Sequence, residues 1–355
     1  MNALEQRIAA EIRRRGPVPF SEVMEAALYD PALGFYATNG AAGRRGDFLT
    51  SPEVGPLFGA VIARALDRWW HDAGEPDPFV VVEAGAGVGT LAVSVLAAKP
   101  ACLPALRYVL VERSDVLRAR HGEHLALESA AYAFAPDRTE SQDEERAVDL
   151  PVGPIVVSLG ELPRVVADVV LANELLDNLP VDLVEGDHEV RVGLGDDRLV
   201  ETLVPVASAP RMRGRIPMQP VATQWVRDAR AVATKVVVFD YADTTSSMAS
   251  RPCEEWLRTY RGHRRGSAVL DDLGTQDITC EVAIDQLPPF AANTSQADWL
   301  RSHGLEQLVE EGRRVWAERA HLGDLEAVKA RSRITEAEAL TDPAGLGAFR
   351  VLEWH

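Results

Sequence analysis

Residues 80–90 read VVVEAGAGVGT, an apolar run followed by one acidic residue and by three glycines at alternate positions. The apolar run predicts a buried strand, and the next residues, TLAVSVLAAK, predict a helix. Gly85, Gly87 and Gly89 stand at the turn between them, where glycine lets the backbone take unusual angles and approach a ligand closely. The stretch therefore predicts a ligand site at a strand–turn–helix junction.

The same alternation of strand and helix continues along the chain. Apolar strands are predicted at residues 107–112, 167–174 and 234–241, with a helix over 114–127, and residues 348–355 predict a final edge strand. Strands separated by helices pair in parallel through right-handed crossovers. The predicted fold is an α/β doubly wound, Rossmann-like sheet.

Two regions are expected. Residues 1–75 predict N-terminal helices and a glycine-rich loop that acts as a lid, with Ser21 capping the second helix and Ser51 opening a later one. Residues 76–355 predict the core, with insertions at about 181–235 and 245–335. The first insertion contains two alternating runs joined by Asp196 and Asp197, which predict a hairpin, and residues 296–341 are expected to be mainly helical.

Composition argues against several classes of protein. A formal charge of −17 over 355 residues argues against non-specific nucleic-acid binding, which needs a basic face. No apolar run approaches the ~18 residues of a membrane span, and the first residues lack the features of a signal peptide. Three scattered cysteines predict neither a disulfide framework nor a zinc site. A cytoplasmic location is the expectation.

The glycine turn favours one class of ligand. A phosphate-binding P-loop needs Lys and Ser or Thr after its last glycine, whereas Thr90 and Leu91 follow Gly89. The dinucleotide fingerprint has a G-x-G-x-x-G spacing, and a carboxylate at Glu83 would repel its pyrophosphate. S-adenosylmethionine carries positive charge and no phosphate, so it fits better. The cofactor-binding residues predicted here are Glu83, Gly85, Ala86, Gly87 and Gly89.

Glu112 ends the next predicted strand, 27 positions after Gly85. A carboxylate at this place can accept hydrogen bonds from both hydroxyls of a ribose, a device that dinucleotide enzymes also use. The alternative is that Glu83 caps a helix and that the glycines only make a tight turn. The acid, the glycines and the second acid together favour the cofactor site.

These residues resemble a known family. E-A-G-A-G-V-G looks like the first motif of class I S-adenosylmethionine-dependent methyltransferases. The stretches GRRGDFLTSPEVGPLFG (43–59), LANELLDNLPVDLV (171–184) and FDYA (239–242) resemble the MidA/NDUFAF7-type (DUF185) family. That resemblance, from about residue 16 to the C-terminus, implies a protein arginine methyltransferase linked to respiratory complex I. Residues 281–284 depart from the family, because Glu281 and Ala283 stand where His and Asp are usual.

The resemblance also implies that residues 47–53 cover the cofactor. Asp47, Thr50 and Glu53 are then expected to face the pocket, with Asp47 on the substrate side and Pro52 beside the cofactor. The alternative is that Ser51 caps a helix and that the segment touches no ligand.

Carboxyl groups follow the strand that ends at Asn173. A guanidinium is a poor nucleophile, and carboxylates can orient it and accept its proton. Glu174 and Asp177 are three apart, which places them on one face of a helical turn. We predict both as catalytic groups and Asn173 as a positioning amide; the alternative is a capping Asp177 and a solvated Glu174.

Asp240 and Tyr241 end a later buried strand and are predicted to line the substrate side. His121 and His124 lie three apart, as metal ligands on a helix do, but no third ligand is evident, so a solvated helix face and no metal are predicted. The predicted reaction is methylation of an arginine nitrogen on a partner protein. A methyltransferase for a small metabolite and a non-catalytic assembly factor remain alternatives.

Overall fold

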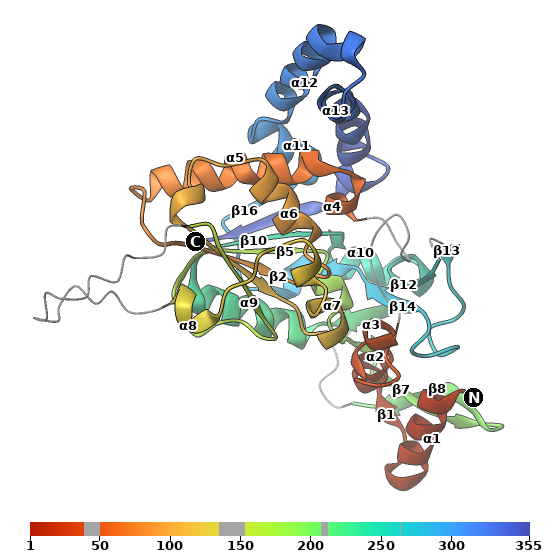
Figure 1. Cartoon of the computed structure of the whole chain (residues 1–355). Helices are drawn as coiled ribbons and strands as arrows, with labels where there is room; N and C mark the ends of the chain where they lie inside the picture. The colour runs from red at the N-terminus through yellow and green to blue at the C-terminus, as the bar shows by residue number, and fades with distance from the viewer. Residues whose placement is uncertain (39–49, 135–152, 207–211, 263) are drawn as a thin grey trace, which may run out of the picture.

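The fold is built on a seven-stranded sheet in the order β16-β17-β10-β5-β2-β3-β4 (Figure 1). The computed structural model describes residues 1–38, 50–134, 153–206, 212–262 and 264–355. Five neighbouring strands run parallel, whereas β17 runs antiparallel to both β10 and β16. The strands are β2 (Phe79–Ala84), β3 (Leu106–Val111), β4 (Ile155–Leu159), β5 (Ala167–Asn173), β10 (Ala233–Asp240), β16 (Ala292–Ser295) and β17 (Arg350–Trp354).

The direction of winding reverses between β2 and β5. The chain passes from β2 outward to β3 and β4, then returns to the other side of β2 with β5 and continues to β10. Ligands bind at such a reversal, outside the carboxyl ends of the strands. In the register, Glu83 pairs with Leu171 and Ala84 with Ala172, so the glycine turn comes beside Asn173. The predicted doubly wound α/β sheet is confirmed.

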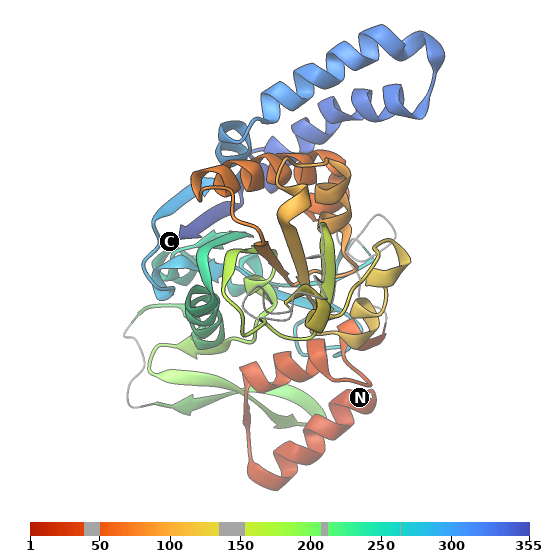
Figure 2. The same ribbon diagram turned by 60° about the vertical axis from the view of Figure 1, so that its left-hand side comes forward.

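Helices cover both faces of the sheet (Figures 1 and 2). One face packs against α5 (Pro56–Asp72), α6 (Thr90–Ala97) and α11 (Gln296–Ser302), and the core there includes Phe58, Leu91 and Trp299. The other face packs against α9 (Pro220–Val232) through Ala222, Val226 and Ala229. Burial of these apolar faces against the sheet stabilises the layers.

A second core joins the N-terminal helices to both insertions. It includes Leu4, Ile8 and Ile12 of the amphipathic first helix, together with Val190 and Trp256. The helices are α1 (Ala3–Arg15), α2 (Phe20–Tyr29) and α3 (Phe35–Thr38), and the strands of their sheet are β1 (Val18–Pro19), β6 (Asp182–Glu185), β7 (His188–Gly195), β8 (Arg198–Pro205) and β9 (Arg215–Met218). Asp196 and Asp197 turn the β7–β8 hairpin with φ of 48° and 57°, so the predicted hairpin is confirmed.

Smaller elements complete the described chain. They are α4 (Ser51–Val54), α7 (Asp115–Arg118), α8 (Ala130–Ala133), α10 (Thr245–Ala249), β11 (Ala242–Asp243), β12 (Leu257–Arg261), β13 (Arg264–Arg265), β14 (Asp277–Cys280), β15 (Val282–Ala283), and the 3₁₀ helices η1 (Leu103–Ala105), η2 (His121–Glu123), η3 (Leu176–Asn178), η4 (Cys253–Glu255), η5 (Ile284–Gln286), η6 (Ala320–Leu322) and η7 (Leu346–Ala348). The predicted helical region over 296–341 is confirmed, and α12 (Leu305–Arg319) and α13 (Leu325–Thr341) form a hairpin that projects from the sheet (Figure 2).

Two sequence predictions about elements are wrong, and one strand was missed. The C-terminal strand is not at the edge, because β16 pairs with its outer side. The predicted helix over 114–127 is broken into α7 and η2. Strand β4 was not predicted as a separate element, although it pairs in parallel with β3 along five residues.

The predicted helix starts also differ. Helix α2 has no side-chain cap, and the N–H of Ser21 is hydrogen-bonded to Asp182 of β6. Ser51 begins only the short α4, and α5 starts after Gly55. The carboxyl of Glu336 accepts the N–H of Leu57 at 2.8 Å, and a Cβ at residue 55 would lie 2.3 Å from that carboxyl carbon. Gly55 therefore lets a distant helix cap α5.

None of the helices in the described part of the chain combines the length and apolar character that a membrane crossing requires.

Candidate active site

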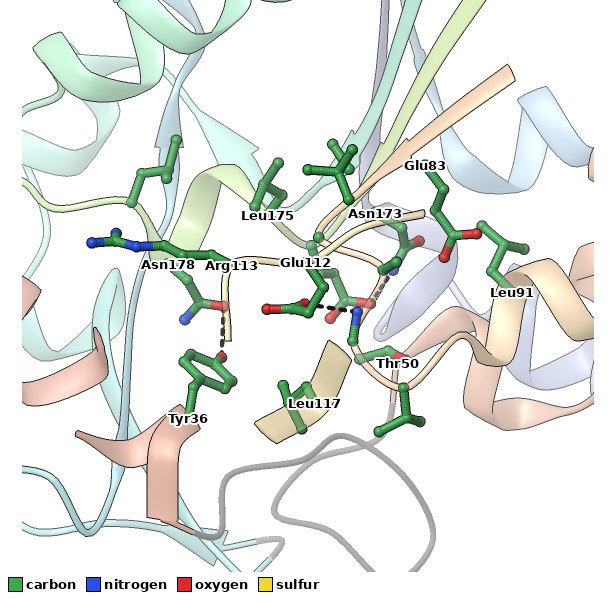
Figure 3. A pocket seen from close by; sticks show the side chains of 18 of the residues that line it. Tyr36, Thr50, Glu83, Leu91, Glu112, Arg113, Leu117, Asn173, Leu175 and Asn178 are labelled. Atoms are coloured by element: carbon green, nitrogen blue, oxygen red, sulfur yellow. Dashed lines mark hydrogen bonds between the residues drawn. The ribbon is translucent and has the colours of Figure 1, made fainter. Parts of the chain in front are cut away.

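A cavity of about 610 Å³ lies at the carboxyl ends of β2, β3 and β5 (Figure 3). This volume is in the range of small-molecule sites. Most of the predicted cofactor residues line it, together with Asn173 and Glu174. Those cofactor residues are Thr50, Pro52, Glu53, Glu83, Gly85, Ala86, Gly87 and Glu112.

The glycine turn is held in a conformation that other residues rarely adopt. Gly85, Gly87 and Gly89 have φ of 70°, 56° and 87°. The amides of Gly85 and Ala86 donate to the carbonyl of Val111 at 2.9 and 3.1 Å, which fastens the turn to the end of β3. A Cβ at residue 87 would meet no atom within 4 Å, so the backbone there borders open space. Gly89 is the N-cap residue of α6 and is not on the cavity wall.

His121 supports this turn from behind. Its ring is fully buried, with Nε2 at 2.9 Å from the carbonyl of Gly87 and Nδ1 at 2.8 Å from Oγ of Ser158. Burial lowers the pKa of His121, which favours the neutral ring. The predicted solvated face is wrong for His121, because η2 turns the side chain inward, and right for His124, which is exposed. The described residues contain no group of three or more side chains placed to bind a metal.

Glu83 serves two purposes at once. Its Oε2 accepts the hydroxyl of Tyr108 at 2.7 Å, and its carboxyl accepts the N–H of Ala92 in the first turn of α6. Burial raises the pKa of Glu83 to about 7. The residue therefore caps a helix, as the alternative interpretation of the sequence predicts, and also lines the cavity (Figure 3). It presents less negative charge to a ligand than the sequence argument assumed.

Glu112 lies on the cavity wall with both carboxyl oxygens engaged by backbone. Oε2 accepts the N–H of Gly87 at 2.9 Å and Oε1 accepts the N–H of Ser114 at 2.7 Å. Each carboxylate oxygen has about two acceptor positions, so one on each oxygen is available for a ribose hydroxyl. Burial raises the pKa of Glu112, although these backbone hydrogen bonds act in the opposite direction.

Asn173 and Glu174 lie beside the glycine turn, and Glu174 has a φ of 50°. Its Oε1 accepts the Nδ2 of Asn173 at 3.1 Å and the N–H of Ser51 at 3.3 Å. Burial, followed by the charge of Asp177, raises the pKa of Glu174 to about 8. Glu174 is therefore a half-buried residue on the cavity wall, with its carboxyl hydrogen-bonded, and not the solvated residue of the alternative interpretation. Oδ1 of Asn173 is buried without a hydrogen-bond partner in the described structure.

The other predicted substrate-side residues lie behind this wall. Asp177 belongs to η3, so the α-helical turn predicted for Glu174 and Asp177 is wrong. Asp240 is buried and accepts the amides of Leu176 and Asp177 at 2.9 and 3.3 Å. Tyr241 donates its hydroxyl to Asp177. In the described chain, Asp177, Asp240 and Tyr241 do not line the cavity. Their hydrogen bonds instead hold the loop after β5 in place.

The described residues of the segment before α5, from Thr50 onward, face the cavity. Thr50, Pro52 and Glu53 line the wall, and Glu53 accepts the hydroxyl of Thr90 at 2.8 Å. Ser51 does not cap its helix, because its hydroxyl donates to Gln296. Asp47 and the predicted lid lie outside the described residues.

Several wall residues were not predicted. Tyr29 and Tyr36 stack with ring centroids 5.5 Å apart, and the guanidinium of Arg113 lies 4.3 Å from the ring centre of Tyr29. Asn178 and Trp225 also contribute. Asn178 follows Asp177 in the family-like stretch 171–184, but the two tyrosines come from the N-terminal helices, and no sequence spacing links them to the glycine turn.

Residue 281, where the chain departs from the family, is part of an ion-pair network. The carboxyl of Glu281 lies 2.7 Å from Arg251 and 2.7 Å from Arg258. Glu281 is not on the cavity wall in the described structure, so this departure from the family leaves the lining residues in place.

Comparison with known proteins agrees with this geometry. Residues 61–303 match the family described as "Putative S-adenosyl-L-methionine-dependent methyltransferase". The chain belongs to this family. A Burkholderia thailandensis protein crystallised with S-adenosyl-homocysteine is 27% identical, with a TM-score of 0.77 over 99% of this chain and 91% of that one. The predicted family, fold, enzyme class and cofactor are confirmed.

Curated relatives carry a more specific name. The Danio rerio protein arginine methyltransferase NDUFAF7, mitochondrial, is 23% identical over 86% of this chain and 77% of its own length. The Drosophila melanogaster homologue is 42% identical, but only over 26% of this chain. This match covers about a fifth of the length of the fly protein, 22%.

The residues on the wall fit S-adenosylmethionine. The backbone beside Gly87 borders open space, Glu112 retains acceptor positions for hydroxyls, and Oδ1 of Asn173 is an acceptor without a partner. A bound cofactor supplies an electrophilic methyl group on a sulfonium. The protein's own task is to hold an acceptor in line with that group, to exclude water and to take up a proton.

Proposed function

We propose that this methyltransferase acts on a nitrogen of an arginine side chain in a partner protein. The observation that carries the proposal is Glu174. It lies half-buried on the cavity wall, beside Asn173 and the glycine turn, and desolvation raises its pKa to about 8. A carboxyl in this state is suited to bind a cation and to accept a proton from it.

Arginine makes particular demands on its site. A guanidinium has a pKa above ~12, and its lone pairs are delocalised over three nitrogens. A carboxylate that accepts its N–H groups orients the planar group and concentrates electron density on one nitrogen. When the guanidinium enters, its charge favours ionised Glu174, which then accepts the proton released as the methyl group arrives.

The acids behind the wall favour a cationic acceptor as well. Burial raises the pKa of Asp177 to about 6 and that of Asp277 to about 8, and it raises the pKa of Asp240 well above the ordinary value. Nearby carboxyls cannot all ionise in a dry environment. An arriving positive charge relieves this repulsion, whereas a neutral or anionic acceptor does not.

The names of the curated relatives support arginine as the acceptor, since they are protein arginine methyltransferases. The partner that the family resemblance implies is a subunit of respiratory complex I. We place the reaction in the cytoplasm as part of the same proposal. The formal charge of −17 suits a partner with a basic surface.

The test follows labelled methyl groups from S-adenosylmethionine into proteins of the native host, with mass spectrometry to identify the modified residue. Label on arginine is the expected result. Label found only in small metabolites would show that the acceptor is a small molecule. Cofactor binding without any transfer would indicate a non-catalytic assembly factor.

A further inference from the structure

Tyr36 lies on the cavity wall, next to Asn178 (Figure 3). Its hydroxyl lies 3.1 Å from Oδ1 of Asn178 and 3.2 Å from Oδ1 of Asp277. Its backbone carbonyl accepts the hydroxyl of Ser114 at 2.7 Å. One residue of the N-terminal segment thus bonds to the loop after β3 and to the loop after β5.

On the acceptor side, the contacts form a closed triangle. Nδ2 of Asn178 donates to Oδ1 of Asp277 at 3.1 Å, and the single hydroxyl proton of Tyr36 is shared between Oδ1 of Asn178 and Oδ1 of Asp277. Burial, followed by the charge of Asp277, raises the pKa of Tyr36 well above its usual value, so the hydroxyl remains a donor. Asn178 directly follows Asp177, so the triangle fixes the end of the loop that carries Glu174.

On the cofactor side, the link continues to the glycine turn. Ser114 donates its N–H to Oε1 of Glu112 at 2.7 Å, and Oε2 of the same carboxyl accepts the N–H of Gly87. A hydrogen-bonded path therefore runs from Gly87 through Glu112, Ser114 and Tyr36 to Asn178. Anything that binds Glu112 acts on one end of this path.

The position of Tyr36 is itself well defined. Its ring stacks on Tyr29, whose hydroxyl donates to the carbonyl of Asn178 at 3.2 Å. The turn that leads to α3 is fixed by Asp30, whose side chain accepts the amides of Ala32 and Leu33 at 3.1 and 2.9 Å. The tyrosine is therefore held on several sides, by its stacked ring, its hydroxyl and its backbone carbonyl.

We propose that Tyr36 is a positioning residue that couples cofactor binding to the order of the acceptor side. Cofactor bound at Glu112 stabilises the loop after β5 and strand β14 through this path, so the acceptor meets a formed site. The proposal deepens the proposed function and rests on it for the role of the acceptor side. The coupling itself involves only residues of this chain and the cofactor product.

Hydrogen–deuterium exchange of the full chain, with and without saturating S-adenosylhomocysteine, tests the coupling. In the wild type we expect the ligand to slow exchange at residues 83–92, which it contacts, and at residues 275–280, which include β14 and lie off the cavity wall. In Tyr36→Phe, protection at 83–92 remains and protection at 275–280 falls by more than half. The control Tyr132→Phe, at an exposed tyrosine of α8, leaves both unchanged.

Ser114→Ala breaks the path at its other contact and is expected to reduce protection at 275–280 in the same way, while Ser114→Thr, which retains the hydroxyl, restores it. If Tyr36→Phe does not fold, the two Ser114 variants test the coupling in its place. Unchanged protection at 275–280 in Tyr36→Phe or Ser114→Ala overturns the coupling, as does its absence in the wild type. Failure of the ligand to bind at all would instead contradict the methyltransferase site.

Discussion

The N–H of Gly87 donates a hydrogen bond of 2.9 Å to Oε2 of Glu112, which joins the turn after β2 to the residue after β3. The carboxyl thereby shapes the glycine turn before any ligand binds. Its second oxygen holds the N–H of Ser114 at 2.7 Å. A single side chain therefore fixes the geometry of the cofactor site and offers acceptor positions to a ribose.

Glu112→Ala is expected to weaken the affinity for S-adenosylhomocysteine by about 1 to 3 kcal/mol, the range for an unsatisfied polar group or a lost hydrogen bond to a charged group. Calorimetric titration measures the change. The matched control is Glu123→Ala, at an exposed acid of η2, which should leave affinity unchanged. Wild-type affinity in a folded Glu112→Ala variant would place the ribose elsewhere.

The protein is expected to bind S-adenosylmethionine and S-adenosylhomocysteine but not NAD. The turn has a G-x-G-x-G spacing in place of the dinucleotide spacing G-x-G-x-x-G, and the carboxyl of Glu83 lies on the cavity wall close to this turn. Titration with all three ligands under the same conditions checks this. Saturable binding of NAD without binding of S-adenosylmethionine would contradict the assignment of the cofactor.

The sequence predicted those parts of the site that depend on local pattern. A strand, three glycines and a helix lie next to one another in the chain, and Glu112 ends the next strand, so sheet topology alone brings them together. The same reasoning placed Asn173 and Glu174 at the carboxyl end of β5. Contacts from distant segments could not be read in this way, because no periodicity relates Tyr36 to Asn178, which is 142 positions away.

The errors have a physical pattern. His121 and Asp177 were assigned to α-helical turns because three-residue spacings suggest them, but both belong to short 3₁₀ helices with different side-chain directions. Asp240 was expected to face a substrate, yet it accepts backbone amides of the loop that carries Asp177. Acids near a site often support the loop rather than the ligand, and the sequence does not separate these roles.

His121→Ala is expected to lower the free energy of unfolding by about 2 to 4 kcal/mol, since it leaves a cavity and removes the partners of Gly87 and Ser158. Affinity for S-adenosylhomocysteine should fall as well, because the glycine turn loses its support. Chemical unfolding and calorimetry measure both. His124→Ala, at the exposed neighbour, is the control and should change neither; equal effects of the two substitutions would exclude this role.

The rate of transfer should rise with pH as pH approaches about 8. Below the pKa of Glu174, which burial raises to about 8, the carboxyl is protonated and cannot accept a proton; above it, the carboxylate is available. A bound cation lowers this pKa, so the limb in the turnover profile should lie at or below that value. A profile of initial rates between pH 6 and 9 that shows no rising limb would remove Glu174 as the proton acceptor.

Glu174→Gln tests the same residue by removing its charge while keeping its shape. Oε1 of Glu174 accepts hydrogen bonds from Asn173 and Ser51, and a glutamine amide oxygen can accept both. The fold and cofactor binding should therefore remain near the wild type. Transfer should fall on the order of 100-fold or more, the scale of lost general-base catalysis, and the rising pH limb should disappear.

Two further variants distinguish the role of Glu174 on the cavity wall from that of Asp177 behind it. Asp177→Asn lies behind the wall and is hydrogen-bonded to Tyr241, so we expect a smaller loss of transfer than for Glu174→Gln. Glu128→Gln, at an exposed acid, is the matched control and should transfer at the wild-type rate. Labelled methyl incorporation into host proteins measures all three. Wild-type transfer by both Glu174→Gln and Asp177→Asn would show that these carboxyls only shape the loop after β5, and the proton acceptor would then have to be sought elsewhere on the cavity wall.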